Sequence, residues 1–137
     1  MKSLQRTLLL LLLTVVSLAG LAQAQYADRI ISVKIPFEFK VGKKTLPAGD
    51  YLVIRTSPYF LVLRNSQGRV LTTTVAATAQ SSTLPSQSKL VFYVQGGEHS
   101  LLRVWQAGDR WGNELTLPKH NTAEARVQGA QVEVAGR

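Results

Sequence analysis

The feature of the sequence that most constrains the fold is a strict alternation of apolar and polar residues over eleven positions. Successive residues of a strand point to opposite faces, so this alternation predicts one strand from Ile31 to Val41 with a single apolar face. Pro36 falls on the polar face and has no N–H to donate, which favours an edge position or a bulge. The apolar positions are Ile31, Val33, Ile35, Phe37, Phe39 and Val41.

Two turns and two further strands follow this run. Gly42 tolerates a positive φ and predicts a turn into a short strand from Lys44 to Leu46. Pro47 fixes φ near the value required at the second position of a β-turn, and Gly49 can relieve backbone strain at the exit of the turn. Together they predict a second turn. The apolar run from Tyr51 to Ile54 then predicts a strand that is buried on both faces and therefore central.

The same succession of strands and turns continues almost to the end of the chain. Short strands at this spacing, seven or eight in all and without a long amphipathic helix, predict an all-β domain, either an antiparallel sandwich or a small barrel. The residues from Lys119 to Arg137 are weakly patterned, and we expect a short helix around Asn121–Val127 or disorder there. The further strands are expected at Tyr59–Arg64, Arg69–Ala79, Lys89–Gln95, Ser100–Gln106 and Leu115–Leu117.

The N-terminal residues have the three parts of a secretory signal peptide. Lys2 and Arg6 precede an apolar run from Leu8 to Leu21, and Ala22-Gln23-Ala24 is a small-x-small cleavage site. The apolar run is shorter than the roughly 20 residues that a spanning helix needs, and we expect no transmembrane segment after cleavage. The sequence therefore predicts a signal peptide over residues 1–24, a β domain over 25–118, a tail over 119–137, and a secreted or periplasmic protein.

The chain contains no cysteine, which limits both its chemistry and its means of stabilisation. Cleavage after Ala24 leaves 113 residues, enough for one domain with its own core. Small secreted domains often depend on disulfides, and this one must be held by packing and strand pairing alone. Thiol catalysis, zinc–thiolate sites and iron–sulfur clusters are excluded.

The charge balance of the exported chain is basic. Without Lys2 and Arg6 it carries 14 basic and 8 acidic residues, a net charge of +6. Such a balance favours anionic partners, which outside the cytoplasm means envelope polymers, lipid headgroups and acidic glycans, and not nucleic acid. The alternative is that the positive charge only keeps the domain soluble.

Several strand and turn motifs occur in an order that resembles a known group of proteins. These motifs are F-x-F-x-V-G at Phe37–Gly42, L-P-A-G-x-Y at Leu46–Tyr51, R-N-x-x-G at Arg64–Gly68 and K-L-V-F at Lys89–Phe92. Together they resemble a group of small exported bacterial proteins, commonest among acidobacteria, over Ile31 to Lys119. The resemblance implies a shared fold, and it carries no catalytic or binding residue across to this chain.

A basic hairpin tip is one candidate for ligand binding. Lys40, Lys43 and Lys44 cluster on it, and like charges in one place could meet a phosphate or a uronic acid. The alternative is that these lysines guard a sheet edge against pairing with another chain.

Aromatic residues form the second candidate. Trp111 lies beside Arg110 in an expected loop, where it could contact a ligand or anchor the loop on the domain. Trp105 lies within an apolar strand and is expected to pack in the core, although with Tyr59 and Tyr93 it could also build a platform for a sugar ring.

Metal binding and catalysis find little support in the residues. His99 and His120 are 21 residues apart, and the spacing typical of zinc ligands is missing even if Glu98 or Asp109 were a third ligand. No serine lies in a nucleophile elbow, and the acids are dispersed along the chain. We therefore expect no cofactor, no metal and no enzyme. A small glycan-acting enzyme would require acids, or an acid and a histidine, to converge in one cleft with Trp111.

The sequence thus favours an exported, non-catalytic module with a binding or structural role in or outside the envelope. The main alternative is a carrier that holds a small apolar ligand or lipid in a barrel interior of several hundred cubic ångströms. An edge strand bearing Pro36 could also receive another protein. The sequence does not choose between a monomer and a dimer.

Overall fold

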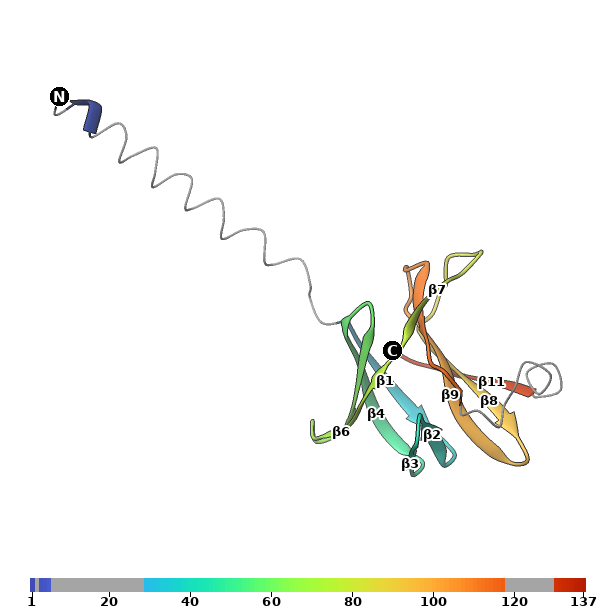
Figure 1. The fold of residues 1–137 in the computed structure, drawn as a ribbon. Helices are drawn as coiled ribbons and strands as arrows, with labels where there is room; N and C mark the ends of the chain where they lie inside the picture. The colour runs from blue at the N-terminus through green and yellow to red at the C-terminus, as the bar shows by residue number, and fades with distance from the viewer. Residues whose placement is uncertain (2, 6–28, 118–129) are drawn as a thin grey trace.

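The computed structural model describes residues 1, 3–5, 29–117 and 130–137, and Figure 1 shows it as a ribbon. Almost all of the chain in the folded part is extended, and eleven described strands form two sheets that face each other. The prediction of an all-β domain is confirmed, in the form of a sandwich. The predicted signal-peptide core and cleavage site and the expected helix at Asn121–Val127 lie outside the described residues.

The smaller sheet has four antiparallel strands. Its order is β1-β4-β5-β6, so β4 is central, as its two-sided apolar pattern predicts, and β1 is an edge strand, as Pro36 predicts. These strands are β1 (Arg29–Ile35), β4 (Gly49–Ser57), β5 (Phe60–Asn65) and β6 (Val70–Val75).

The larger sheet has seven strands, with β8 and β9 at its centre. Its main order is β11-β8-β9-β10-β7, and β2 runs parallel to β9 while it also pairs with β3. The bounds are β2 (Phe39–Val41), β3 (Lys44–Leu46), β7 (Ala77–Gln80), β8 (Lys89–Gln95), β9 (Glu98–Trp105), β10 (Trp111–Glu114) and β11 (Ala130–Ala135).

The chain crosses between the sheets at two places where the sequence predicts one continuous strand. The prediction of a single strand from Ile31 to Val41 is wrong, because the strand breaks between Ile35 and Phe39 and its second part joins the other sheet. The expected strand over Arg69–Ala79 breaks in the same way at Ala76, which is buried. Both sheets turn their inner faces to one core, so the alternation of buried and exposed residues continues from Ile35 to Phe39. Beyond Ala76 the alternation is interrupted, because Ala77 and Thr78 are both exposed.

The C-terminal part of the chain also differs from expectation. The expected strand at Leu115–Leu117 is wrong, and the strand lies earlier, as β10. The expectation of a weakly structured tail is wrong for Ala130–Ala135, which form β11 and pair with β8 along their whole length. Beyond β11, the N–H and C=O of Arg137 each bond to Ser32 at 2.8 Å. These two bonds close the outer edge of β1 at this point.

The tight turns are built as the glycines predict, with one exception. Gly42 has a φ of 60°, and Gly96 and Gly97 both have positive φ in the two-residue turn between β8 and β9, the geometry that such hairpins need. Gly49 does not have a positive φ and is instead the first residue of β4.

Side chains from both sheets fill the core between them. Phe39 of the larger sheet meets the ring of Tyr51 edge to face, with ring centroids 5.2 Å apart, and the ring of Phe92 at 5.5 Å. Tyr93 points to the opposite face from Phe92 and forms a second, smaller cluster with Leu102 and Leu117. No helix in the described part of the chain is long and apolar enough to cross a membrane.

Candidate functional site

The residues that the sequence singles out lie in two separate places. Lys40 pairs with Ser100 near the beginning of β9, whereas the ring of Trp105, the last residue of β9, lies against Gly112, the neighbour of Trp111. A strand advances about 3.3 Å per residue, so the two places are separated by roughly 15–20 Å along β9. The structure therefore does not combine the basic tip and Trp111 in one site.

The basic tip belongs to a larger group of cations, which we call the cationic end. Lys34 pairs with Asp50 at the beginning of β4, directly after β3, and Arg64 pairs with Val70 at the closed end of the β5–β6 hairpin. The hairpins meet there, because Lys44 Nζ donates a hydrogen bond to the carbonyl oxygen of Leu71. The cationic end consists of Lys34, Lys43, Lys44, Arg64 and Arg69.

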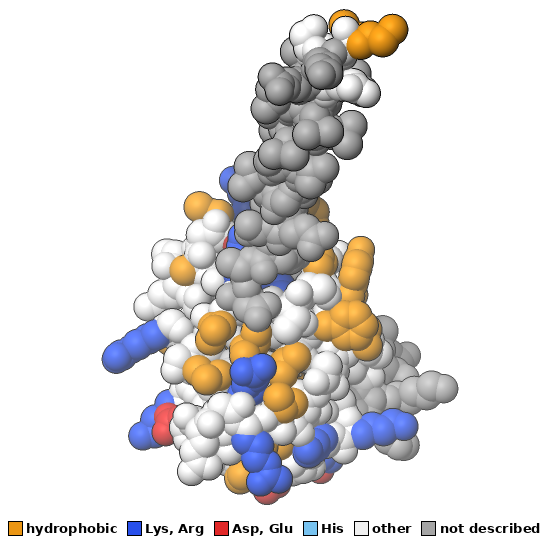
Figure 2. Space-filling model, turned by 90° about the vertical axis from the view of Figure 1, so that its left-hand side faces the viewer, with side chains coloured by type: hydrophobic (Ala, Val, Ile, Leu, Met, Phe, Trp, Pro, Cys, Tyr) orange, Lys and Arg blue, Asp and Glu red, His pale blue; other side chains and the backbone are white. Residues whose placement is uncertain are grey.

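The cations of the cationic end form no ion pairs among the described residues, although Asp50 lies opposite Lys34 on the neighbouring strand. Lys40, in contrast, is paired with Glu98 at 2.8 Å. Glu38 and Asp50 are the described acids that remain outside ion pairs. Figure 2 faces the left-hand side of the view in Figure 1 and shows Lys and Arg side chains toward the lower end of the molecule, with fewer Asp and Glu side chains.

A groove of about 210 Å³ lies next to the cationic end. The ring of Phe37 stacks on that of His99 with centroids 3.9 Å apart and an angle of 17° between the planes. Glu38 and Glu98 also line this groove, so two carboxylates and an imidazole share it. Trp111 does not line this groove, and the carboxylate of Glu98 forms an ion pair with Lys40.

A second open groove, of about 330 Å³, lies between the loop after β7 and the outer face of the larger sheet. Trp105 is half-buried there and belongs to neither core cluster, so the expectation that it packs in the core is wrong. Tyr93, in contrast, is buried and cannot join a surface platform. The groove is lined by Ser81, Thr83, Leu84, Pro85, Ser86, Gln87, Lys89, Trp105 and Glu133.

The backbone around Trp111 is fixed while its indole ring is exposed. The N–H of Trp111 bonds to Asp109 Oδ1 at 2.9 Å, and its carbonyl oxygen accepts a bond from Arg55 Nη1 at 3.1 Å. The carbonyl oxygen of Arg110 accepts a bond from the N–H of Ser81. Trp111 is 53% exposed, at the end of the sandwich opposite the cationic end.

One charged cluster was missed by the sequence analysis. The carboxylate of Asp109 bonds to Arg29 and, at 2.7 Å, to Arg55 Nη2. Burial alone would raise the pKa of Asp109, but the hydrogen bond from the Trp111 N–H and the two guanidinium groups hold this pKa below its usual value. The partners are 80 and 54 residues away in the chain, so no local pattern signals the cluster.

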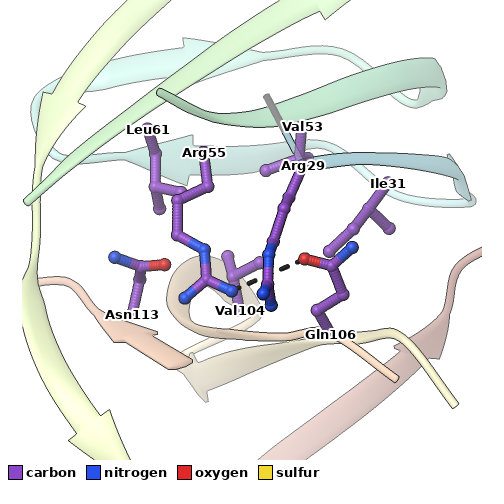
Figure 3. A pocket seen from close by; sticks show the side chains of 8 residues that line it. All are labelled: Arg29, Ile31, Val53, Arg55, Leu61, Val104, Gln106 and Asn113. Atoms are coloured by element: carbon purple, nitrogen blue, oxygen red, sulfur yellow. Dashed lines mark hydrogen bonds between the residues drawn. The ribbon is translucent and has the colours of Figure 1, made fainter. Parts of the chain in front are cut away.

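The space beside this cluster is small. Figure 3 shows Arg29, Arg55, Gln106 and Asn113 pointing into the gap between the sheets. The cavity that they line measures about 10 Å³, which is about the space of one water molecule. Asn113 is buried and donates a hydrogen bond to the carbonyl oxygen of Pro58 at 2.8 Å. The cluster therefore stabilises the contact between the sheets and offers no room for a larger ligand.

The described residues form no metal site, and the comparisons with known proteins identify no family. In the part of the chain that the structure describes, no group of three His, Asp or Glu residues could hold a metal ion, and His120 lies outside that part. No family model, no curated protein and no solved structure matches the chain. The geometry and charge of the described residues are therefore the features that bear on the function of this chain.

Proposed function

We propose that this protein is an exported, non-catalytic binding module of the cell envelope that holds an anionic polymer at its cationic end. The observation that carries the proposal is the group of five cations without carboxylate partners, gathered where two hairpin tips meet. Export is inferred from the signal-peptide pattern at residues 1–24.

The arrangement of the cationic end suits a polymer better than a small anion. Its side chains come from β1, the β2–β3 hairpin and the β5–β6 hairpin, so they are spread over one end of the sandwich and do not converge in a pocket. A chain with repeated phosphate or carboxylate groups can meet several such cations at once, and each contact adds to the affinity. The partner class is therefore a polyanion of the envelope, such as a polymer with phosphodiester or uronic acid groups.

The two alternatives have weaker support. A carrier of lipid or another apolar ligand needs an enclosed cavity of several hundred cubic ångströms, and the space at Arg29 and Asn113 between the sheets measures about 10 Å³. The groove at Phe37 brings Glu38, Glu98 and His99 together, as a glycan-acting enzyme would need, but Glu98 is bound to Lys40 there. We therefore rank the binding module first.

The proposal is tested by binding to isolated envelope material. The full chain is expressed, the exported protein is purified, and its retention on envelope fractions is measured from low to high salt. We expect retention at low salt and its loss at high salt, because salt screens exposed charges. The double variant Lys43→Glu, Arg69→Glu should bind at least about tenfold more weakly, since each cation near an anionic surface contributes about 1 kcal/mol.

The single variant Lys43→Glu has a matched control in Arg110→Glu, which makes the same charge change at the other end of the sandwich. Arg110→Glu should bind nearly as well as the unaltered chain. Equal losses in these two single variants would mean that net charge alone drives the binding, and the absence of binding at low salt would refute the proposal.

A further inference from the structure

The two edge strands of the smaller sheet, β1 and β6, differ in whether their outer side is hydrogen-bonded. At β1, Ser32 exchanges two backbone hydrogen bonds with Arg137, and Gly136 bridges to Val33. At β6, by contrast, no strand of the described chain pairs on the outer side. This edge thus presents backbone donors and acceptors that another strand could use.

The chemistry of β6 is unusual for a free edge. Natural edge strands are commonly protected by charges, proline or shortness, and the six residues of Val70–Val75 contain neither a charge nor a proline. Valine and threonine, which make up most of this strand, are strong strand formers. Among the described residues, Lys44 protects one end of the edge, because its Nζ bonds to the carbonyl oxygen of Leu71. No described strand pairs with the stretch from Thr72 to Val75 on its outer side.

We propose that β6 pairs in antiparallel fashion with β6 of a second copy of this chain, with Thr73 opposite Thr73. The faces of the sheet require the two-fold axis to pass through a residue and not between two residues, and Thr73 is the central residue of the threonine run. Thr73 pairs with Val62 and is exposed on the outer face, while Thr72 pairs with Leu63 and, like Thr74, is half-buried toward the core. A two-fold axis perpendicular to the sheet at Thr73 then places Thr72 opposite Thr74, on the same face.

This register makes β6 complementary to itself. Threonine faces threonine at all three central positions, a cross-strand pair that stabilises antiparallel sheets. The chain is basic and two copies repel each other, but the contact strand itself carries no charge, so no like charges meet at its centre. A second copy can therefore pair with this edge without placing like charges opposite each other.

The same geometry limits the assembly to two copies. An isologous contact uses the same surface on both molecules and leaves no second β6 edge free. The other edge of the smaller sheet is engaged by Gly136 and Arg137. The expected product is a closed dimer with one continuous sheet of eight strands, four from each copy.

Cross-linking tests the register directly, because the chain has no cysteine of its own. Opposed residues of an antiparallel pair have Cα atoms about 4.5–5.5 Å apart, within the range that a disulfide can bridge. The exported full-length product carrying Thr73→Cys should form a disulfide-linked dimer under mild oxidation. Ser32→Cys is the matched control, on the outer face of the same sheet at its closed edge, and should stay mainly monomeric. Equal cross-linking of the two variants would overturn the proposal.

Analytical ultracentrifugation of variants without introduced cysteines measures the oligomeric state independently of cross-linking. The unaltered protein should sediment as a dimer that dissociates on dilution. Thr73→Lys should be monomeric because two lysines would lie opposite each other, and Lys44→Ala should associate more tightly because Leu71 is released. A monomer at every concentration, or an open series of larger aggregates, would overturn the dimer. Such a result would leave binding to envelope material unaffected, so the two proposals fail separately.

Discussion

Arg55 and Asp109 join the two sheets of the sandwich through a nearly buried ion pair. Arg55 Nη2 lies 2.7 Å from Asp109 Oδ2, and each side chain is 15% exposed. Arg55 is a residue of β4 in the smaller sheet, and Asp109 follows β9 in the larger one. Because the chain has no cysteine, no disulfide can join the two sheets, and this ion pair is a non-covalent link between them.

Asp109→Asn should destabilise the fold. The substitution leaves an acceptor for the N–H of Trp111 but removes the charge that balances Arg55 and Arg29. Leaving a mostly buried guanidinium without its carboxylate should lower the free energy of unfolding by about 1–3 kcal/mol. Chemical denaturation measures this loss. Glu133→Gln is the control, because its pair with Lys89 is exposed and should be worth no more than about 1 kcal/mol. Equal effects would contradict the structural role of Asp109.

The same carboxyl group should make stability depend on acidity. The pKa of Asp109 is lower in the folded chain than its usual value, so the folded state favours the ionised form. Its contribution is present above the unfolded pKa of about 3.9 and is lost as the pH falls through the lower folded pKa. Denaturation at several pH values should show the unaltered protein and Asp109→Asn converging in acid. A difference in stability that did not change with pH would contradict this assignment.

Gly112→Ala should disturb the packing of Trp105. A Cβ atom at position 112 would lie 2.5 Å from Trp105 Cε3 and 2.7 Å from the carbonyl oxygen of Val104, and the backbone atom cannot swing away. Overpacking of this kind typically costs about 1–3 kcal/mol. Indole fluorescence in a Trp111→Phe background reports Trp105 alone, and its emission should shift. Trp105→Ala should recover only part of the loss, because the contact with Val104 remains. An unchanged free energy of unfolding would contradict this prediction, because it would mean that β10 shifts enough to accommodate the Cβ atom at no cost.

Gly136→Ala should open the seam between β1 and the C-terminal residues. A Cβ atom there would collide with Ile31 Cγ2 and press on the carbonyl oxygen of Ser32. Hydrogen exchange should therefore accelerate at the amide of Arg137, which bonds to Ser32, while amides at the centre of β9 remain protected. Equal acceleration in both places would indicate global destabilisation instead of local opening.

The sequence predicted the local elements of this fold better than their assignment to sheets. The turns at Gly42 and Gly96-Gly97 and the central position of β4 were predicted from residue types, because local backbone preferences decide them. The crossings at Pro36 and Ala76 were missed. A period of two residues is the same on either inner face of a sandwich, so it cannot reveal where the chain changes sheets.

In the candidate site, too, features set by neighbouring residues could be predicted, whereas features set by strand pairing could not. The positive charge at Lys43 and Lys44 could be recognised because these residues are adjacent in sequence. That Arg64 and Arg69 join them, and that Glu98 neutralises Lys40, depends on strand pairing over long stretches of chain. β11 was missed because its short pattern, Ala130–Ala135, becomes stable only when it pairs with β8.

Short strands with one apolar face could be predicted from residue order alone, because the alternation of side chains allows little else once water must be excluded from that face. Which strands share a sheet, which charges are paired and which described edge is unpaired depend on the folded arrangement. These properties arise from contacts between residues far apart in the chain, and the energies of such contacts exist only after the strands have packed together.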